Sequence, residues 1–448
     1  MKLWQKKSTL DTHIESFTIG RDQVLDMELA HHDVLGTMAH VIMLAEMGII
    51  ELADAKLLST GLLEIHEQIQ SGQFAIENGM EDVHSQIENL LTRKLGDAGK
   101  KVHTARSRND QVLTALRLYI RDQLLQISKK MNSLIRILIR LSNEYADVFL
   151  PGFTHYQLAM PSSFGNWFGA YAESFKEDLR FISHVFQLVN RNPLGSAAGF
   201  GVNLPIKKEL TTIYLGFQTG DRHEVFASMG RGKSELQIMH AFSNLAMTFN
   251  RFASDIILYS NQRFGYIQLP DEFTTGSSIM PHKKNPDVFE LIRGKSNQLH
   301  GSLTEMLMLT SNLISGYHRD YQLLKEGLMD SFNRVHDLLD VSIHIIPSLK
   351  INTNIYAEEY QLLFTTDAVY ELVQRGTPFR EAYREVVDQV DSGSFSHQKV
   401  DIPSRKEQIV QKNDVLLQEL DDIMESFCEN IIRQCLQALF QKVQEISK

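Results

Sequence analysis

The positions of the prolines restrict the fold of this 448-residue chain more than any other feature. The chain holds 10 prolines, and residues 1–150, 206–269 and 287–346 contain none of them. A proline inside a helix removes a backbone hydrogen bond and costs about 3 kcal/mol, so long helices require proline-free stretches. We therefore predict a chain built mainly from helices, with its longest helices in these segments.

Residues 112–150 carry the clearest helical pattern. Apolar side chains recur there every three or four positions, which places them along one side of a helix. This stripe consists of Leu113, Leu116, Ile120, Leu124, Ile127, Met131, Leu134, Leu138, Leu141 and Tyr145. Further apolar residues widen the stripe beyond one face, so the helix must be buried among other helices. Residues 225–263 and 287–345 are predicted to form two more long helices.

From these patterns we expect an all-α fold with a central bundle of very long antiparallel helices. Residues 1–106 are predicted to form an N-terminal helical domain, residues 107–350 the central bundle, and residues 351–448 a small C-terminal helical domain. The wide apolar surfaces of the bundle predict self-association, because one chain of this length can hardly cover them.

The overall composition argues against several classes of protein. A net charge of −10 argues against a nucleic-acid-binding protein that relies on bulk positive charge. The chain has no run of about 18 apolar residues and no apolar stretch of the kind that marks a secretory signal, so we expect no membrane span. Cys428 and Cys435 are seven residues apart in a helical pattern, hence on one face of a helix, and are expected to be buried thiols in a reducing compartment. Their spacing does not match a metal site. A cytoplasmic protein is therefore predicted.

Polar segments interrupt the helical pattern at three places. KKVHTARSRNDQV (residues 100–112) stands before the first long helix, and it either caps that helix or offers two arginines to a carboxylate. PGFTHYQLAMP (151–161) is predicted to be a rigid turn between helices, where its histidine is either structural or functional. YHRDYQLLKE (317–326) is read as part of a helix whose polar face is either solvated or functional.

A fourth polar segment, FTTGSSIMPHKKNPD (273–287), combines a glycine, two serines, two prolines and two lysines. Gly276 and the serines favour mobility, whereas Pro281 and Pro286 restrict the shape of the loop. A loop of this kind that leads into a helix is typical of an anion clamp or a catalytic lid. It lacks the residue order GxxxxGK[ST], so it is not a P-loop.

The fourth segment closely resembles the signature loop GSSxMPxKxNP of the fumarase/aspartase superfamily. The remaining segments are similar to those of one member, the argininosuccinate lyase family: HTARSRNDQV, GFTHYQLAMP, YHRDYQLLKE and RGTPFREAY occur in the family's order over nearly the whole chain. The resemblance implies an all-helical homotetramer whose central helices form a 20-helix bundle. It also implies active sites that each take residues from three subunits, a small-molecule substrate, and no metal or organic cofactor.

The implied reaction is a reversible β-elimination of argininosuccinate to arginine and fumarate, the last step of arginine biosynthesis. By resemblance, Ser277 is the base, Lys283 stabilises the developing negative charge, and His155 assists as acid with Glu290 as its carboxylate partner. The resemblance also implies substrate-binding residues: Ser107, Arg108, Asn109, Thr154, Asn285, Tyr317, Gln322 and Lys325.

The chain departs from the family pattern mainly where the amino-acid half of the substrate is expected. Asp22 stands in place of a serine that contacts substrate, whereas Asp26 is retained. Ala105 replaces a glycine, which is a mild change provided that the backbone there has no positive φ. The other replacements are Leu158, Met160, His282 and His318. The alternatives are therefore a related fumarate-releasing lyase with another leaving group, such as adenylosuccinate, and a catalytically silent, crystallin-like homologue.

Overall fold

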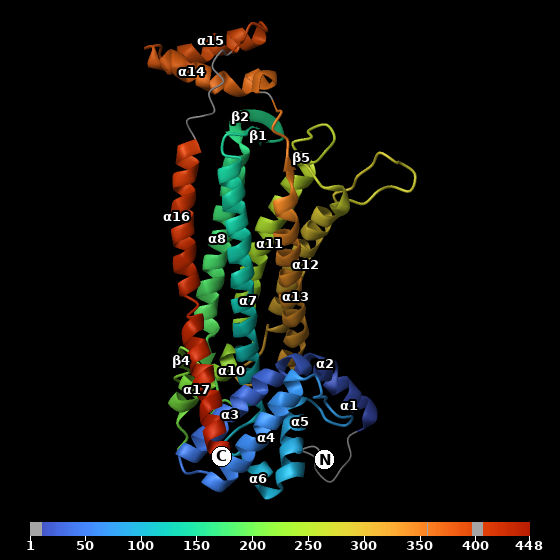
Figure 1. Cartoon of the computed structure of the whole chain (residues 1–448), viewed down its shortest axis with the longest axis vertical. Helices are drawn as coiled ribbons and strands as arrows, with labels where there is room; N and C mark the ends of the chain where they lie inside the picture. The colour runs from blue at the N-terminus through green and yellow to red at the C-terminus, as the bar shows by residue number, and fades with distance from the viewer. Residues whose placement is uncertain (1–10, 356, 397–405) are drawn as a thin grey trace.

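The computed structural model describes residues 11–355, 357–396 and 406–448, and it confirms the predicted all-helical fold class (Figure 1). Five long helices run side by side along the molecule. They are α7 (Arg108–Glu144), α8 (Phe164–Val189), α11 (Lys233–Tyr259), α12 (Asp287–Leu309) and α13 (Leu323–Ile345). At 1.5 Å per residue, the 37 residues of α7 extend over about 55 Å. The two ends of this bundle are therefore far apart.

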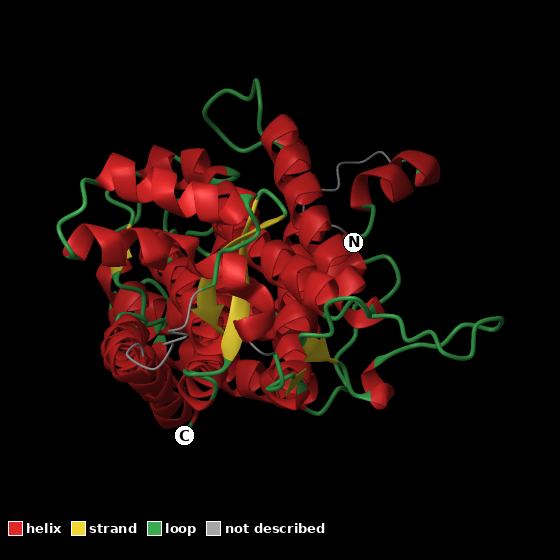
Figure 2. Ribbon diagram, turned by 90° about the horizontal axis from the view of Figure 1, so that it is seen from above, coloured by secondary structure: helices red, strands yellow, loops and turns green. Residues whose placement is uncertain are grey.

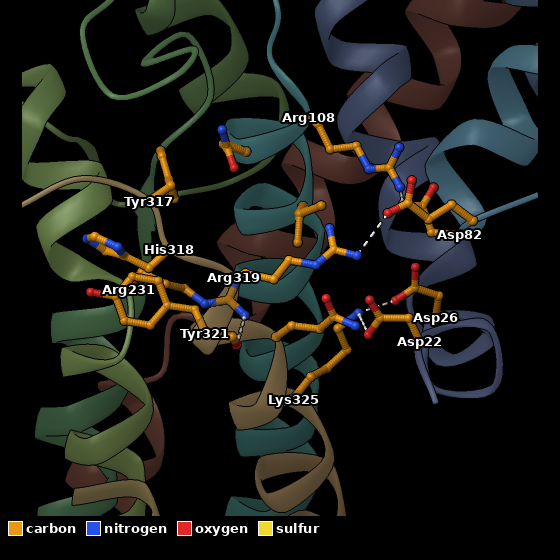
Figure 3. Close-up of a pocket in the computed structure, with 14 residues that line it drawn as sticks. Asp22, Asp26, Asp82, Arg108, Arg231, Tyr317, His318, Arg319, Tyr321 and Lys325 are labelled. Atoms are coloured by element: carbon orange, nitrogen blue, oxygen red, sulfur yellow. Dashed lines mark hydrogen bonds and ion pairs between the residues drawn. The ribbon is translucent and has the colours of Figure 1, made fainter. Parts of the chain in front are cut away.

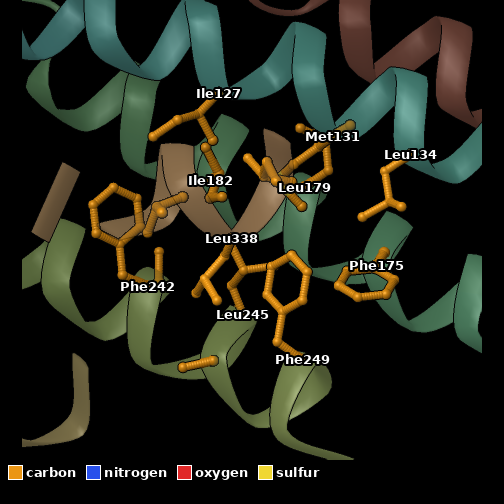
Figure 4. Packing of buried hydrophobic residues seen from close by; sticks show 14 of the residues in the cluster. Ile127, Met131, Leu134, Phe175, Leu179, Ile182, Phe242, Leu245, Phe249 and Leu338 are labelled. Atoms are coloured by element: carbon orange, nitrogen blue, oxygen red, sulfur yellow. The ribbon is translucent and has the colours of Figure 1, made fainter. Parts of the chain in front are cut away.

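Apolar residues of these helices fill the space between them (Figure 4). Ile127 of α7, Leu179 of α8, Phe242 of α11 and Leu338 of α13 belong to one core and are at most 1% exposed. The wide apolar stripe of α7 is buried because the helix packs against both α8 and α13. This core holds the bundle together and fixes the positions of the loops at its two ends.

The predicted helix 112–150 is shorter at its C-terminal end than the sequence indicated. Helix α7 ends at Glu144, and the chain then forms a hairpin of β1 (Phe149–Thr154) and β2 (Gln157–Ser163). Pro151 and Pro161 lie opposite each other in this hairpin. A two-stranded sheet has only edge strands, where proline is tolerated, so the two prolines that were expected to stiffen a turn lie in strands instead.

The other two predicted long helices are each divided in the structure. The segment 225–263 consists of α10 (Glu224–Gly230) and α11, separated at Gly232, which has a φ of 78°. The segment 287–345 consists of α12 and α13, which are antiparallel neighbours, so its prediction as one helix was wrong. The chain between them has positive φ at Asn312 and Gly316. Left-handed residues interrupt a right-handed helix, and no proline marked the break.

The N-terminal elements pack together at one end of the bundle, where the described chain begins (Figure 1). They are α1 (Thr12–Ile19), α2 (Asp22–Asp26), η1 (Met27–Leu29), α3 (Ala30–Glu46), α4 (Leu52–Gln70), α5 (Val83–Leu95), α6 (Asp97–Lys100) and η2 (Lys101–His103). Short elements of the central segment also belong to the fold. They are β3 (Arg191–Asn192), α9 (Lys208–Tyr214), β4 (Thr219–Gly220), β5 (Ile267–Gln268), η3 (Asp271–Phe273), η4 (Arg319–Gln322), η5 (Ile346–Ser348) and β6 (Lys350–Ile351).

The C-terminal part of the chain lies in two places. At the end of the bundle far from the N-terminal helices are η6 (Ala357–Phe364), α14 (Thr365–Gln374) and α15 (Phe379–Asp391) (Figure 1). Helix α16 (Lys406–Glu425) returns along α7 and α8, and α17 (Glu429–Ser447) packs on α3 and α4. The boundaries of the three predicted domains stay a prediction, but these two helices lie against the other parts of the chain.

Two further expectations concern the cysteines and the membrane. Cys428 is exposed and Cys435 is half-buried, so the prediction of two buried thiols was wrong. Cys428 does not lie on a helix face because it occupies the junction before α17, where its φ is 53°. Among the described residues, no helix combines the length and the apolar character needed to cross a membrane.

Candidate active site

A pocket at the N-terminal end of α7 brings together five of the predicted substrate-binding residues (Figure 3). These five are Arg108, Asn109, Tyr317, Gln322 and Lys325. They come from the start of α7 and from the chain that runs through η4 into α13. Tyr317 and His318 lie in the loop before η4, not on a helix face as the sequence reading had placed them. Burial raises the pKa of Tyr317 to about 12.

The first turn of α7 is fixed by a capping arrangement. The Ser107 Oγ accepts a hydrogen bond from the Asn109 N–H at 3.3 Å, and Asp110 Oδ1 accepts one from the Ser107 N–H at 2.9 Å. Asp110 Oδ2 accepts two more from the N–H groups of Gly195 and Ala197, at 3.0 and 2.8 Å. Ser107 is thus the N-cap residue, and Asp110 ties the start of α7 to the chain after α8.

Ala105 adopts a φ of 60° two residues before this cap. The replacement of glycine there was expected to be mild only if the backbone avoided positive φ, and the backbone does not avoid it. An alanine in the left-handed region costs about 1–2 kcal/mol. The chain segment that leads into α7 and the pocket therefore contains a strained residue.

Acidic residues from the N-terminal elements pair with the basic residues of the pocket. Asp82 forms an ion pair with Arg108 and caps α5 by accepting a hydrogen bond from the Ser85 N–H at 2.8 Å. Arg108 Nη1 also donates to Ser85 Oγ at 2.9 Å. Beneath this pair, His84 Nδ1 lies 2.8 Å from Asp33 Oδ1, and both side chains are 2% exposed. Arg108 is thus held in place by Asp82 and Ser85 at the start of α5.

The residues before and within α13 are bonded to the N-terminal helices. Gln322 Nε2 donates to the carbonyl oxygens of Thr18 and Ile19, each at 3.0 Å. Lys325 Nζ donates to Asp22 Oδ1 at 2.8 Å and to Asp26 Oδ1 at 2.5 Å. Burial raises the pKa of Asp22, and the adjacent Lys325 ammonium opposes this effect. Asp22, which stands where the family pattern has a serine, thus lies in the lining of the pocket.

Two arginines of the pocket were missed by the sequence analysis. Arg319 donates to the Thr18 carbonyl at 2.7 Å and to Glu81 at 3.1 Å, and it lies within the YHRDYQLLKE segment that was singled out. Arg231 lies 2.9 Å from Glu235 and donates to the Tyr321 carbonyl at 3.1 Å. In the sequence, Arg231 stands between two glycines at the break between α10 and α11, and it belongs to none of the motifs described above.

Thr154 and His155 lie at a second place, the tip of the β1–β2 hairpin. Thr154 pairs with Gln157, and the turn between them holds His155 and Tyr156 with φ values of 54° and 59°. Two successive residues with positive φ are the geometry of a type I′ hairpin turn. Both Thr154 and His155 are exposed. Leu158 and Met160, two of the replaced positions, lie on β2 and are also exposed.

The signature loop is a third place and projects away from the bundle (Figure 2). A bridge between Thr275 and Asn285 closes its base, with the Asn285 N–H donating to the Thr275 carbonyl at 2.8 Å. Within the loop, Ser277 Oγ accepts hydrogen bonds from the N–H groups of Ile279 and Met280, at 3.3 and 3.2 Å. Donors aimed at this oxygen favour its anionic form.

The remaining residues of the predicted catalytic set are exposed. Lys283 lies in the signature loop, and Glu290 lies in the first turn of α12. His282, one of the replaced positions, is also exposed in this loop. No hydrogen bond or ion pair among the described residues joins His155 to Glu290. The single chain therefore brings five of the predicted binding residues together in the pocket, and it leaves Thr154, Asn285 and the predicted catalytic residues on the hairpin, the signature loop and the start of α12. Because the hairpin follows the end of α7, about 55 Å separates it from the pocket at the start of this helix.

The comparisons with known proteins agree with the fold and the motifs. A sequence profile of the lyase family matches residues 4–301. An argininosuccinate lyase from Phocaeicola vulgatus is 47% identical over 89% of this chain and 90% of its own length. One from Thermotoga neapolitana is 39% identical over 86% of this chain and 98% of its own length.

Solved structures of other enzymes share the fold at lower identity. An EDDS lyase in complex with formate superposes with a TM-score of 0.76 at 21% identity, covering 99% of this chain and 97% of its own. The class II fumarase from Schistosoma mansoni gives a TM-score of 0.70 at 18% identity, covering 93% and 96%. The relatives that share close to half of the residues over most of both chains show that this chain belongs to the argininosuccinate lyase family.

Proposed function

We propose that this chain cleaves argininosuccinate into arginine and fumarate by β-elimination. Its family membership supports the proposal, as do the pocket residues and the signature loop. The single observation that carries the chemistry is the position of Ser277 Oγ between two backbone N–H donors. A serine hydroxyl is too weak a base without such help, and the donors lower the free energy of the alkoxide.

The proposed reaction begins at the carbon next to a succinyl carboxylate. Ser277 removes a proton from this carbon, and the electron pair moves into the adjacent carboxylate, which Lys283 and Asn285 stabilise. The pair then forms the C=C bond of fumarate as the C–N bond breaks. His155, oriented by Glu290, assists the transfer of a proton to the departing guanidino nitrogen. One C–H and one C–N bond break, and no electrons leave the substrate.

Binding is assigned to the pocket and the hairpin. Ser107, Arg108, Asn109 and Thr154 position the succinyl carboxylates. Tyr317, Gln322 and Lys325 contact the amino-acid half. The proposal uses no metal or organic cofactor, because acid, base and orientation supply what the elimination needs.

The separation of the three segments requires other copies of the chain. We propose a homotetramer in which the pocket of one chain meets the hairpin and the signature loop of two others. Large apolar side chains on the outside of the bundle support such an interface, since Met247, Leu291 and Met308 are between 55% and 75% exposed. Exposure of this kind marks contact surfaces. The cytoplasm is the compartment we propose for the assembly.

The experiment follows absorbance at 240 nm while purified protein is offered argininosuccinate and adenylosuccinate in parallel. The proposal expects fumarate from argininosuccinate only. Fumarate from adenylosuccinate alone would keep the elimination and replace the substrate. No fumarate from either would favour the catalytically silent homologue. The pocket supports argininosuccinate, because its mixed acidic and basic lining suits an amino-acid zwitterion.

A further inference from the structure

The N-terminal wall of the pocket presents hydrogen-bond acceptors to Gln322 of η4 and to Lys325 of α13. The carbonyls of Thr18 and Ile19 and the carboxylates of Asp22 and Asp26 take the hydrogen bonds of Gln322 and Lys325. In Figure 3, Asp22 and Asp26 lie together on one side of the pocket, and Arg231 lies on the other. A wall of acceptors is suited to a cation and not to a carboxylate.

Lys325, Asp22 and Asp26 form a group of one ammonium and two carboxylates. With all three ionised, the group carries a net charge of −1. Lys325 is 4% exposed, and two of its three N–H donors are used on these carboxylates. A buried lysine that is already neutralised in this way offers little attraction to the carboxylate of a ligand.

The two carboxylates differ in what they still offer to a ligand. Asp26 is 1% exposed and also accepts a hydrogen bond from the Val83 N–H. The Asp22 side chain is 14% exposed, and only its Oδ1 takes part in the hydrogen bonds of the described residues. Asp22 Oδ2 therefore remains as an acceptor on the side of the pocket that holds both carboxylates.

We propose that Asp22 binds the α-ammonium group of the amino-acid half of the substrate and makes the site select ligands with a free α-amino group. This inference rests on the proposed function. It assigns to Asp22 a role that a serine cannot fill in the same way, because a serine would leave Lys325 and Asp26 as a neutral pair. Asp22 supplies the carboxylate that would attract the ammonium group.

The test compares arginine with 5-guanidinopentanoate, which is arginine without its α-amino group, as inhibitors of fumarate release by the full-length protein. An ionic hydrogen bond in a partly enclosed site corresponds to about a 10- to 100-fold difference in affinity. We expect arginine to inhibit more strongly than 5-guanidinopentanoate by this factor.

The substitutions Asp22→Asn and Asp22→Ser are expected to remove this preference, to raise KM for argininosuccinate, and to change kcat much less. The control is Glu326→Gln, which removes one carboxylate from the exposed ion pair with Arg21 beside the pocket. Glu326→Gln should keep the preference for arginine. Folding of each variant is checked by its helical circular dichroism and its sedimentation.

Each outcome of this test supports or overturns a stated part of the inference about Asp22. Equal inhibition by arginine and 5-guanidinopentanoate in the unaltered protein overturns the inference, even if the Asp22 variants fail to fold. A preference that persists in Asp22→Asn overturns the assignment to Asp22. Absence of fumarate from argininosuccinate is a different result, because it contradicts the proposed function. In that case arginine binding by calorimetry still tests whether Asp22 recognises an ammonium group.

Discussion

The pocket at the start of α7 and the two segments at the other end of the bundle differ in how their polar groups are satisfied. In the pocket, Arg108, Lys325 and their acidic partners are held by ion pairs to buried side chains of the same chain. At the other end, His155 and Lys283 are exposed. One chain thus holds these binding groups in place, whereas His155 and Lys283 lack surroundings that would hold them in a reactive geometry.

The two ends of the bundle therefore differ in how strongly the fold of one chain fixes their polar side chains. A charged network inside one chain is costly to disturb, because each group that loses its partner stays buried. Exposed groups on a hairpin and a loop cost little to move, and they gain a defined environment only when another surface covers them. Substitutions at the two ends should therefore fail in different ways.

The largest effect is expected from Ser277→Ala. Removal of the proposed base should lower the rate of fumarate release by about 10³-fold or more, while the unfolding midpoint stays unchanged because Ser277 lies on a projecting loop. The matched control is Ser278→Ala in the same loop, which removes the neighbouring hydroxyl and should have a much smaller effect. Equal losses for the two variants would contradict the assignment of the base.

A large effect on stability is expected from Asp110→Asn. The buried carboxylate of Asp110 accepts hydrogen bonds from three backbone N–H groups, and an amide that turns an N–H donor toward at least one of them should cost about 4 kcal/mol in the free energy of unfolding. Urea denaturation at a fixed protomer concentration measures this cost. The control at the other end is Asp271→Asn, which breaks the exposed pair with Lys284 and should leave the midpoint unchanged. Similar losses in both variants would remove the contrast between the two regions.

The smallest effect is expected from Ala105→Gly, and its sign is opposite. Glycine adopts positive φ without the steric cost of the alanine Cβ, so the variant should be more stable by about 0.5–1 kcal/mol. Ala170→Gly, on the exposed side of α8, should instead lose about 1 kcal/mol. Thermal unfolding of both variants tests the pair of signs, and a loss in Ala105→Gly would show that the strain is not relieved.

The sequence predicted the helical bundle because proline gaps and apolar spacing are local signals. It failed at the breaks in 225–263 and 287–345, which lie at Gly232, Asn312 and Gly316, because a glycine or asparagine marks the end of a helix less sharply than a proline does. The hairpin at 149–163 was missed for a related reason. Its strands pair only with each other, so they need no long run of β-forming residues.

For the site, the motifs located the predicted residues in or next to four polar segments of the sequence, but they did not show which segments meet. Arg231 was missed because an isolated arginine is usually a solvated surface residue. Arg319 lies in a segment that was singled out, but the sequence did not show that its side chain lines the pocket. The roles of Ser277, His155, Lys283 and Glu290 stay a prediction, because no single chain assembles them.

The most direct test of the account mixes two variants that are inactive for different reasons. Arg108→Ala damages the pocket, and Ser277→Ala damages the signature loop. If sites form between copies, hybrid assemblies made by co-expression contain some sites with both segments intact. At equal amounts this gives about a quarter of the unaltered rate, because each segment is intact in half of the copies. Native mass spectrometry verifies the hybrids. Restored fumarate release is the predicted result, and inactive hybrids would contradict a site shared between chains.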